Sequence, residues 1–152
     1  MTEMHTIVVG IDGSESSVKA LRFALHEAGS HHAQLKAVMA WSVPPLAYGA
    51  TWSVPVYVED YAKIAQTELD KSLADAGAAN SGVTVTQLLR QGQPAEILCA
   101  EAEGADLLIV GSRGLGGFRG LLLGSVSQQC ANHAPCPVVI IPHERGENPA
   151  DA

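Results

Sequence analysis

The stretch that decides the fold runs Asp106-Leu-Leu-Ile-Val-Gly-Ser-Arg-Gly-Leu-Gly-Gly-Phe-Arg-Gly-Leu-Leu-Leu-Gly-Ser125. It begins with a short apolar run typical of a buried strand, continues as a glycine-rich loop, and ends where a helical pattern starts. A loop between a strand and a helix N-terminus gathers unpaired backbone N–H groups and the positive end of the helix dipole in one small volume. The stretch therefore predicts a phosphate-binding site.

The glycines of this loop follow the spacing Gly111-x2-Gly114-x9-Gly124-Ser125. We expect Gly111 to permit a sharp turn at the strand end, Gly114 to let a ligand approach the backbone, and Gly124 to clear the space before the helix. Ser125 and Ser127 would add hydroxyl donors to the backbone N–H groups. Each part of the spacing thus has a physical reason if a phosphate is bound there.

Outward from this stretch, short β-branched runs alternate with longer amphipathic ones along the chain. Such alternation is typical of a parallel sheet wrapped by helices, with right-handed crossovers and helices on both faces. If the first and fourth strands are neighbours, the loops 10–14 and 111–125 meet at the carboxyl edge of the sheet. The expected strands are 6–11, 35–41, 83–89, 106–110 and 137–141, and the expected helices are 14–29, 57–76, 94–103 and 125–132.

Length and composition favour one α/β domain over residues 1–142, followed by a flexible polar tail over 143–152, within a chain of 152 residues. The net charge of −7 opposes nonspecific binding to nucleic acid, because a phosphate backbone attracts clustered lysine and arginine. No apolar run reaches the ~20 residues that a membrane span requires, and no basic leader is present, so we expect a cytoplasmic protein without membrane contact. The three cysteines lack C-x-x-C spacing and are predicted to be small buried hydrophobes, not a disulfide framework or a metal site.

The glycine spacing, with the opening Ile7-Val-Val-Gly-Ile-Asp-Gly-Ser14 and the closing Cys136-Pro-Val-Val-Ile-Ile-Pro142, closely resembles the universal stress proteins over residues 5–142. The pattern G-x2-G-x9-G-[ST] is that of the family's ATP-binding branch. The resemblance implies an open, Rossmann-like five-stranded parallel sheet of order 3-2-1-4-5. It also implies a bound ATP, or AMP or cyclic AMP, with Mg²⁺ or Mn²⁺, and a homodimer formed through the C-terminal strand, whose apolar edge favours pairing.

The resemblance carries the family's nucleotide contacts onto eight positions of this chain. An acidic residue that ends the first strand meets the ribose or a metal-linked phosphate, and a main-chain position in the second strand holds the adenine edge. Loop glycines contact ribose and phosphate, and the start of the next helix cradles the phosphates. In that order the positions are Asp12, which is also the candidate metal ligand, Ala40, Gly111 with Gly114, and Gly124 with Ser125, Val126 and Ser127.

Several of these residues also have a simpler interpretation. Asp12 fits a turn residue that caps the following helix, with Asp12-Gly-Ser-Glu15 as a capping box. Ser125 fits an N-cap with Gln128 three residues later. Arg113 and Arg119 are equally compatible with phosphate neutralisation and with a solvated surface. The segment 42–57, rich in proline and aromatic residues, fits a lid or partner surface as well as a loop that buries its aromatics.

Rival nucleotide-binding classes lack their required residues. A Walker loop needs a lysine beside its glycines, but no lysine follows Lys71, and a dinucleotide fold needs G-x-G-x-x-G after the first strand, which is absent. We therefore expect a nucleotide-dependent sensor or regulator of the stress response with no catalytic residue and at most slow hydrolysis. The alternatives are a weak ATPase or other nucleotide-dependent enzyme that uses Asp12 and a bound metal, and a structural dimer that prefers AMP or cyclic AMP.

Overall fold

The computed structural model describes residues 3–44, 57–113 and 123–142. Four expectations from the sequence lie outside these ranges, namely the contact of Gly114, the role of Arg119, the role of most of segment 42–57, and the tail 143–152. The strands are β1 (Thr6–Ile11), β2 (Gln34–Trp41), β3 (Val85–Gln91), β4 (Leu107–Gly111) and β5 (Val138–Ile141), and the helices are α1 (Glu15–His31), α3 (Val58–Asp75), η1 (Ala78–Asn80, 3-10), α4 (Pro94–Glu101) and α5 (Ser125–His133).

The five strands form one parallel sheet in the order β3-β2-β1-β4-β5, which confirms the predicted architecture. β1 lies at the centre, where Val9 pairs with Ile109 of β4 and Ile11 pairs with Met39 of β2. The chain winds from β1 toward β3 in one direction and from β4 toward β5 in the other. The reversal of winding therefore falls between β1 and β4.

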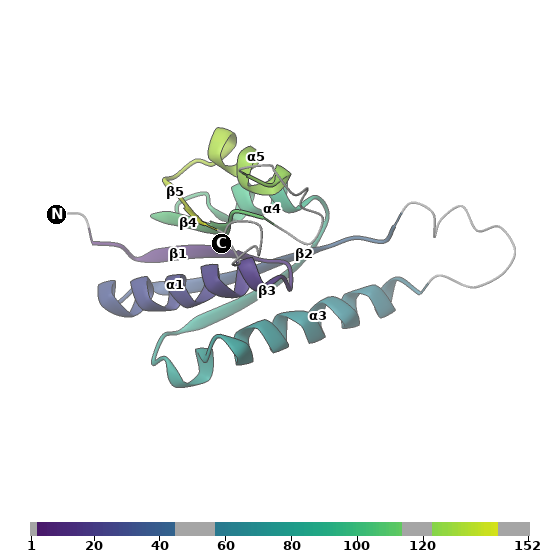
Figure 1. Cartoon of the computed structure of the whole chain (residues 1–152), viewed down its shortest axis with the longest axis horizontal. Coiled ribbons are helices and arrows are strands. Elements are labelled where there is room, and N and C mark those ends of the chain that lie inside the picture. The colour runs from purple at the N-terminus through teal and green to yellow at the C-terminus, as the bar shows by residue number, and fades with distance from the viewer. Residues whose placement is uncertain (1–2, 45–56, 114–122, 143–152) are drawn as a thin grey trace, which may run out of the picture.

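Helices cover both faces of the sheet, as expected, with α1 and α3 below it and α4 and α5 above it in Figure 1. Alternate side chains of β1 serve the two layers, since successive side chains of a strand point to opposite faces. Ile7 and Val9 pack with Leu21 and Leu69 in the first layer, whereas Val8 packs with Leu98 and Cys130 in the second. The central strand is thus buried on both faces.

β3 begins two residues later than the sequence pattern indicates, because a turn occupies the residues before it. η1, which the sequence analysis did not predict, extends the chain past α3, and the hydroxyl of Ser81 donates to the carbonyl of Ala78 at 2.6 Å. The N–H of Val83 then donates to Ser81 Oγ at 3.2 Å, so Val83 belongs to the turn.

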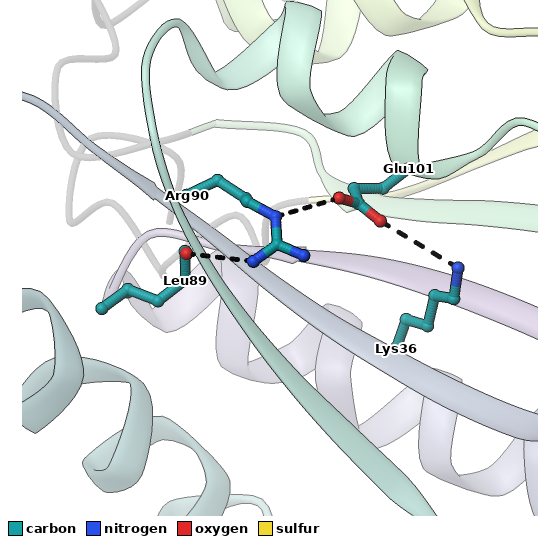
Figure 2. A network of polar contacts seen from close by, with 4 residues as sticks. All are labelled: Lys36, Leu89, Arg90 and Glu101. Atoms are coloured by element: carbon teal, nitrogen blue, oxygen red, sulfur yellow. Dashed lines mark hydrogen bonds and ion pairs between the residues drawn. The ribbon is translucent and has the colours of Figure 1, made fainter.

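α4 is tied to the sheet by a network of charged side chains (Figure 2). Glu101 accepts a hydrogen bond from Arg90 Nε of β3 at 3.2 Å through Oε1, and Lys36 Nζ of β2 lies 4.0 Å from its Oε2. Arg90 also donates to the Leu89 carbonyl at 3.4 Å. Since these side chains are partly exposed, each ion pair contributes at most about 1 kcal/mol.

None of the helices in the described ranges has the length and hydrophobicity that crossing a bilayer requires.

Candidate functional site

The candidate site lies at the carboxyl ends of β1 and β4, where the winding of the sheet reverses and open α/β sheets bind their ligands. Asp12 follows β1, and Gly111 is the last residue of β4. The first turn of α1 packs against the end of β4. The 10–14 loop, which leads into α1, and the start of the glycine loop are therefore neighbours, as the sequence predicts.

Gly111 is required for a reason that differs from the expected sharp turn. Gly111 is not among the residues with a positive φ, which are Gly13 and residues elsewhere in the described chain. Instead, a Cβ at Gly111 would stand 2.9 Å from the backbone carbon and oxygen of Ser16. Glycine is needed because the first turn of α1 presses directly on the end of β4.

The backbone of Ser112 closes the base of the glycine loop. Its carbonyl accepts the N–H of Gly124 at 2.6 Å and the hydroxyl of Ser127 at 3.0 Å, while its own N–H donates to the carbonyl of Ile141 at 2.9 Å. The two ends of the loop are thereby held together at the carboxyl edge of β4 and β5. The sequence analysis missed Ser112, although its place inside the glycine motif marks it.

α5 begins at the site with an N-terminus that no side chain caps among the described residues. Gly124, in an extended conformation with φ −70° and ψ 167°, is the N-cap, and Ser125 is the first helical residue. The N-cap role predicted for Ser125 is therefore wrong. The first helical hydrogen bond runs from the N–H of Gln128 to the Gly124 carbonyl at 3.0 Å, so the N–H groups of Ser125, Val126 and Ser127 precede the helical ladder.

The two predicted hydroxyl donors of α5 differ sharply in environment. Ser125 is exposed, whereas Ser127 is 2% exposed and its hydroxyl lies 3.0 Å from the carbonyls of both Ser112 and Gly124. A hydroxyl has one hydrogen to donate, so the side chain of Ser127 holds the loop base and does not serve as the expected ligand donor. Val126 is half-buried and packs against the α4 and α5 layer.

Asp12 organises the turn between β1 and α1. Its Oδ1 accepts the N–H of Ser14 at 2.9 Å and also the Ser14 hydroxyl, which is an Asx turn. The N-cap of α1 is Ser14, whose Oγ accepts the N–H of Ser17 at 3.2 Å. Asp12 is therefore a turn residue, as its simpler interpretation predicts, but the N-cap is Ser14 and not Asp12. The half-buried carboxylate stands at the carboxyl end of β1.

A second carboxylate that the sequence analysis missed reaches the same turn. Gly13 has φ +85°, and a Cβ built there would stand 2.8 Å from Oε2 of Glu68, a half-buried residue of α3. No local pattern links Glu68 to the turn, because the contact joins distant parts of the chain. Asp12 and Glu68 give this side of the site a negative character that suits ribose hydroxyls or a cation.

Ala40 and Arg113 complete the described part of the site. Ala40 pairs with Arg90 of β3. It follows Met39, which forms the last pair between β2 and β1, so the main chain of Ala40 lies past the end of the β1–β2 pairing. Arg113 is half-buried, and its Nε is shielded from solvent without a hydrogen-bond partner in the described part of the chain. This burial does not fit the solvated-surface interpretation of Arg113 and leaves a guanidinium donor beside the loop.

The donor set fits an anion with a polar sugar better than a metal centre. First-turn N–H groups of α5 and the Arg113 guanidinium attract negative charge, whereas the carboxylates of Asp12 and Glu68 lie at the turn that follows β1. Within the described ranges, no three His, Cys, Asp or Glu side chains are placed to hold a metal ion. A divalent ion at Asp12 would therefore need further ligands from outside this set.

Comparison with known proteins gives one consistent result. The family model described as universal stress protein family matches residues 3–142. A universal stress protein of Thermus aquaticus is 36% identical over 138 residues, covering 90% of this chain and 97% of its own length. One of Mycolicibacterium smegmatis is 36% identical over 139 residues, covering 89% of this chain but only 45% of its own, so the chain spans about half of that relative. A solved universal stress protein in complex with cyclic AMP is 29% identical, with a TM-score of 0.67 and coverage of 92% of this chain and 98% of that one.

Proposed function

Because the chain belongs to the universal stress protein family, we propose that it binds an adenine nucleotide at the carboxyl ends of β1 and β4 and acts as a nucleotide-dependent sensor or regulator in the stress response. The observation that carries this proposal is the uncapped start of α5 directly above the loop base that Ser112 closes. It is supported by the relative of known structure that is in complex with cyclic AMP.

In this proposal the phosphates lie against the N–H groups of Ser125, Val126 and Ser127 and against the backbone of the loop that contains Gly114. The half-buried Arg113 supplies positive charge in a part of the chain that has no lysine. These donors are backbone N–H groups and one guanidinium, so they bind negative charge without the ammonium group of a lysine. As a glycine, residue 124 places no side chain in front of these N–H groups.

The sugar and base occupy the side of the site nearer β1 and β2. Asp12 accepts from a ribose hydroxyl, the backbone at Gly111 borders the ribose, and the main chain of Ala40 receives the adenine edge. Asp12 is also our candidate for a ligand of Mg²⁺ or Mn²⁺, which would arrive with a triphosphate and neutralise part of its charge. These assignments, like the choice of ATP over AMP or cyclic AMP, are proposals.

Calorimetric titration with ATP, AMP and cyclic AMP, each with and without Mg²⁺, tests the proposal. We expect saturable binding by wild type and its loss in Gly124→Glu, since that substitution places a side chain and a negative charge in the phosphate volume. Gln129→Glu adds the same charge to an exposed position of α5 and should bind as wild type does. Equal binding by wild type and Gly124→Glu would show that the site is misplaced.

The same preparation distinguishes a binding protein from a weak ATPase. We expect at most slow phosphate release that does not depend on Asp12, because Oδ1 of Asp12 already accepts two hydrogen bonds from Ser14. Turnover that disappears in Asp12→Asn would assign the protein to the enzyme class instead.

We further propose that residues 1–142 act as one domain and that the protein is a homodimer that pairs through β5. β5 forms an edge of the described sheet, and each of its four residues is only half-buried. The cytoplasmic location and the absence of nucleic-acid and membrane partners stay predictions from the sequence.

A further inference from the structure

The side chain of Glu68, in the middle of α3, lies over the turn that follows β1. The three heavy atoms nearest to a Cβ built at Gly13 all belong to Glu68, with Oε2 at 2.8 Å, Cδ at 3.7 Å and Cβ at 3.9 Å. Gly13 stands between Asp12 and Ser14, and Ser14 donates its N–H and its hydroxyl to Oδ1 of Asp12. One carboxylate therefore belongs to this turn, and a second one covers it.

The negative charge of Glu68 is not neutralised by a partner in the part of the chain that the structure describes. No hydrogen bond or ion pair within that part reaches its carboxylate, although the residue is half-buried. The Glu101 carboxylate of α4, by contrast, is paired with both Arg90 and Lys36 (Figure 2). Glu68 thus adds uncompensated negative charge to the turn after β1.

The groups that attract anions lie next to the neighbouring strand. The uncapped N–H groups of α5 and the guanidinium of Arg113 both follow β4, which pairs directly with β1. Paired strands lie only ~4.8 Å apart, so the polarity of the site changes over a short distance. A nucleotide whose 5′ phosphates bind at the start of α5 therefore directs its sugar toward the turn that carries Asp12 and Glu68.

The substituents of the ribose decide whether this turn attracts or repels it. A free 2′ or 3′ hydroxyl can donate a hydrogen bond to a carboxylate oxygen. A phosphate ester on either oxygen removes that donor and brings about two negative charges toward the carboxylates. The carboxylates thus favour a sugar with free hydroxyls and oppose a phosphorylated one.

We propose that Glu68 is a specificity-determining residue of the site. It admits 5′-nucleotides whose ribose hydroxyls are free and rejects those that carry a further phosphate on the 2′ or 3′ oxygen. This inference rests on the proposed nucleotide function and narrows the class of ligand. Glu68, and not Asp12, is assigned this role because Oδ1 of Asp12 is already engaged by Ser14.

The proposal is distinct from a packing role of Glu68. The stem of its side chain also contacts Gly13, so removal of the whole side chain would disturb the turn as well as the charge. Glu68→Gln keeps the length and shape of the side chain and removes only the charge. The informative quantity is therefore the ratio of two dissociation constants, since a disturbed turn would weaken both ligands.

The test is calorimetric titration of the full-length protein, in the presence of a chelator, with 5′-AMP, adenosine 2′,5′-bisphosphate and adenosine 3′,5′-bisphosphate. We expect wild type to bind each bisphosphate more weakly than 5′-AMP by about tenfold or more. Glu68→Gln should reduce this ratio by about threefold or more, whereas Glu68→Asp, which keeps the charge, should largely preserve it. A circular dichroism spectrum of each variant checks its fold.

Glu103→Gln is the matched control. It removes an equal charge at an exposed position before β4, far from the carboxyl end of that strand, and should leave the ratio as in wild type. A ratio that Glu103→Gln reduces as much as Glu68→Gln would assign the effect to net charge and overturn the proposal.

Two further outcomes separate this inference from the proposed function. If wild type binds 5′-AMP and both bisphosphates equally, or if Glu68→Gln leaves the ratio unchanged, the role of Glu68 is refuted and the nucleotide site stands. If wild type binds none of the nucleotides that the titrations compare, ATP included, the site itself is refuted together with this inference.

Discussion

Gly111 and Ser16 meet so closely that the first turn of α1 leaves no room for a side chain at the end of β4. A Cβ at Gly111 would lie 2.9 Å from both the carbonyl carbon and the carbonyl oxygen of Ser16, which are backbone atoms and cannot rotate away. We expect Gly111→Ala to lower the free energy of unfolding by about 1–3 kcal/mol, the usual cost of overpacking a fixed site.

Chemical denaturation of Gly111→Ala and Gly29→Ala checks this expectation. The nearest atom to a Cβ at Gly29 is Cγ2 of Val83, at an ordinary 3.7 Å, and Gly29 lies within a helix. Gly29→Ala should therefore be neutral or stabilising by up to about 1 kcal/mol, as alanine is the better helix former. Equal stability of the two variants would contradict the close packing at Gly111.

Ser125 and Ser127 should respond in opposite ways to removal of their hydroxyl groups. Ser127→Ala deletes the buried donor to the carbonyls of Ser112 and Gly124 and should lower the free energy of unfolding by about 1 kcal/mol. Ser125→Ala alters an exposed hydroxyl and should leave stability unchanged. Denaturation midpoints measured without nucleotide test the pair, and a larger loss in Ser125→Ala would reverse the assignment of their roles.

Asp106 should give the protein an acid-sensitive contact between β1 and β4. Its Oδ2 accepts the N–H groups of His5 at 2.7 Å and Thr6 at 3.0 Å, and these bonds, that from Thr6 foremost, hold the pKa of the carboxyl below its ordinary 3.8. A carboxyl whose pKa is lower in the folded than in the unfolded chain adds stability above the ordinary value. That stability is lost as the pH falls from 3.8 through the folded-state pKa.

The unfolding free energy as a function of pH tests this contact in wild type and Asp106→Asn. The variant should be less stable near neutral pH, and its stability should fall less steeply on the acid side. Asp75→Asn, which removes an equal charge at the exposed end of α3, serves as the control. An Asp106→Asn curve parallel to that of wild type would rule out this role of Asp106.

The proposed homodimer makes a prediction about individual residues of β5. The carbonyls of Pro137 and Ile141 accept the N–H groups of Leu108 and Ser112, so these alternate residues of the strand face β4. By the same alternation Ile140 presents its N–H to the outer edge. Ile140→Pro should therefore preserve the fold and abolish dimer formation, because proline is tolerated where an edge N–H points outward.

Light scattering over a range of concentrations measures this effect. Val139→Pro is the matched variant, since residue 139 faces β4 and its substitution should reduce stability. A dimer that persists in Ile140→Pro, or a wild-type protein that is monomeric at every concentration, would remove β5 as the interface.

The sheet was predictable because its strands are short, β-branched and buried on both faces, so their pattern differs plainly from that of the helices. Its strand order followed from the resemblance carried by the glycine spacing. The start of β3 was misplaced because apolar Val83 looks like a strand residue, and only its bond to Ser81 Oγ assigns it to a turn.

The candidate site was predictable in position but less so in detail. The motif located the edge between β1 and β4. A serine that follows a glycine, however, fits an N-cap and a first helical residue equally well, and Ser125 is the first helical residue. The contacts of Ser16 with Gly111 and of Glu68 with Gly13 join residues far apart in the chain. Such pairs leave no trace in local spacing, so they emerge only once the helices are packed.

The backbone of Ser112 connects the glycine loop to the terminal strand. Through its N–H it belongs to the ladder with Ile141, and through its carbonyl it holds Gly124 and Ser127. A ligand that changed the conformation of the glycine loop would therefore also act on β5 through Ser112. If subunits assemble along this strand, thermodynamic reciprocity requires each event to alter the equilibrium constant of the other by an equal factor.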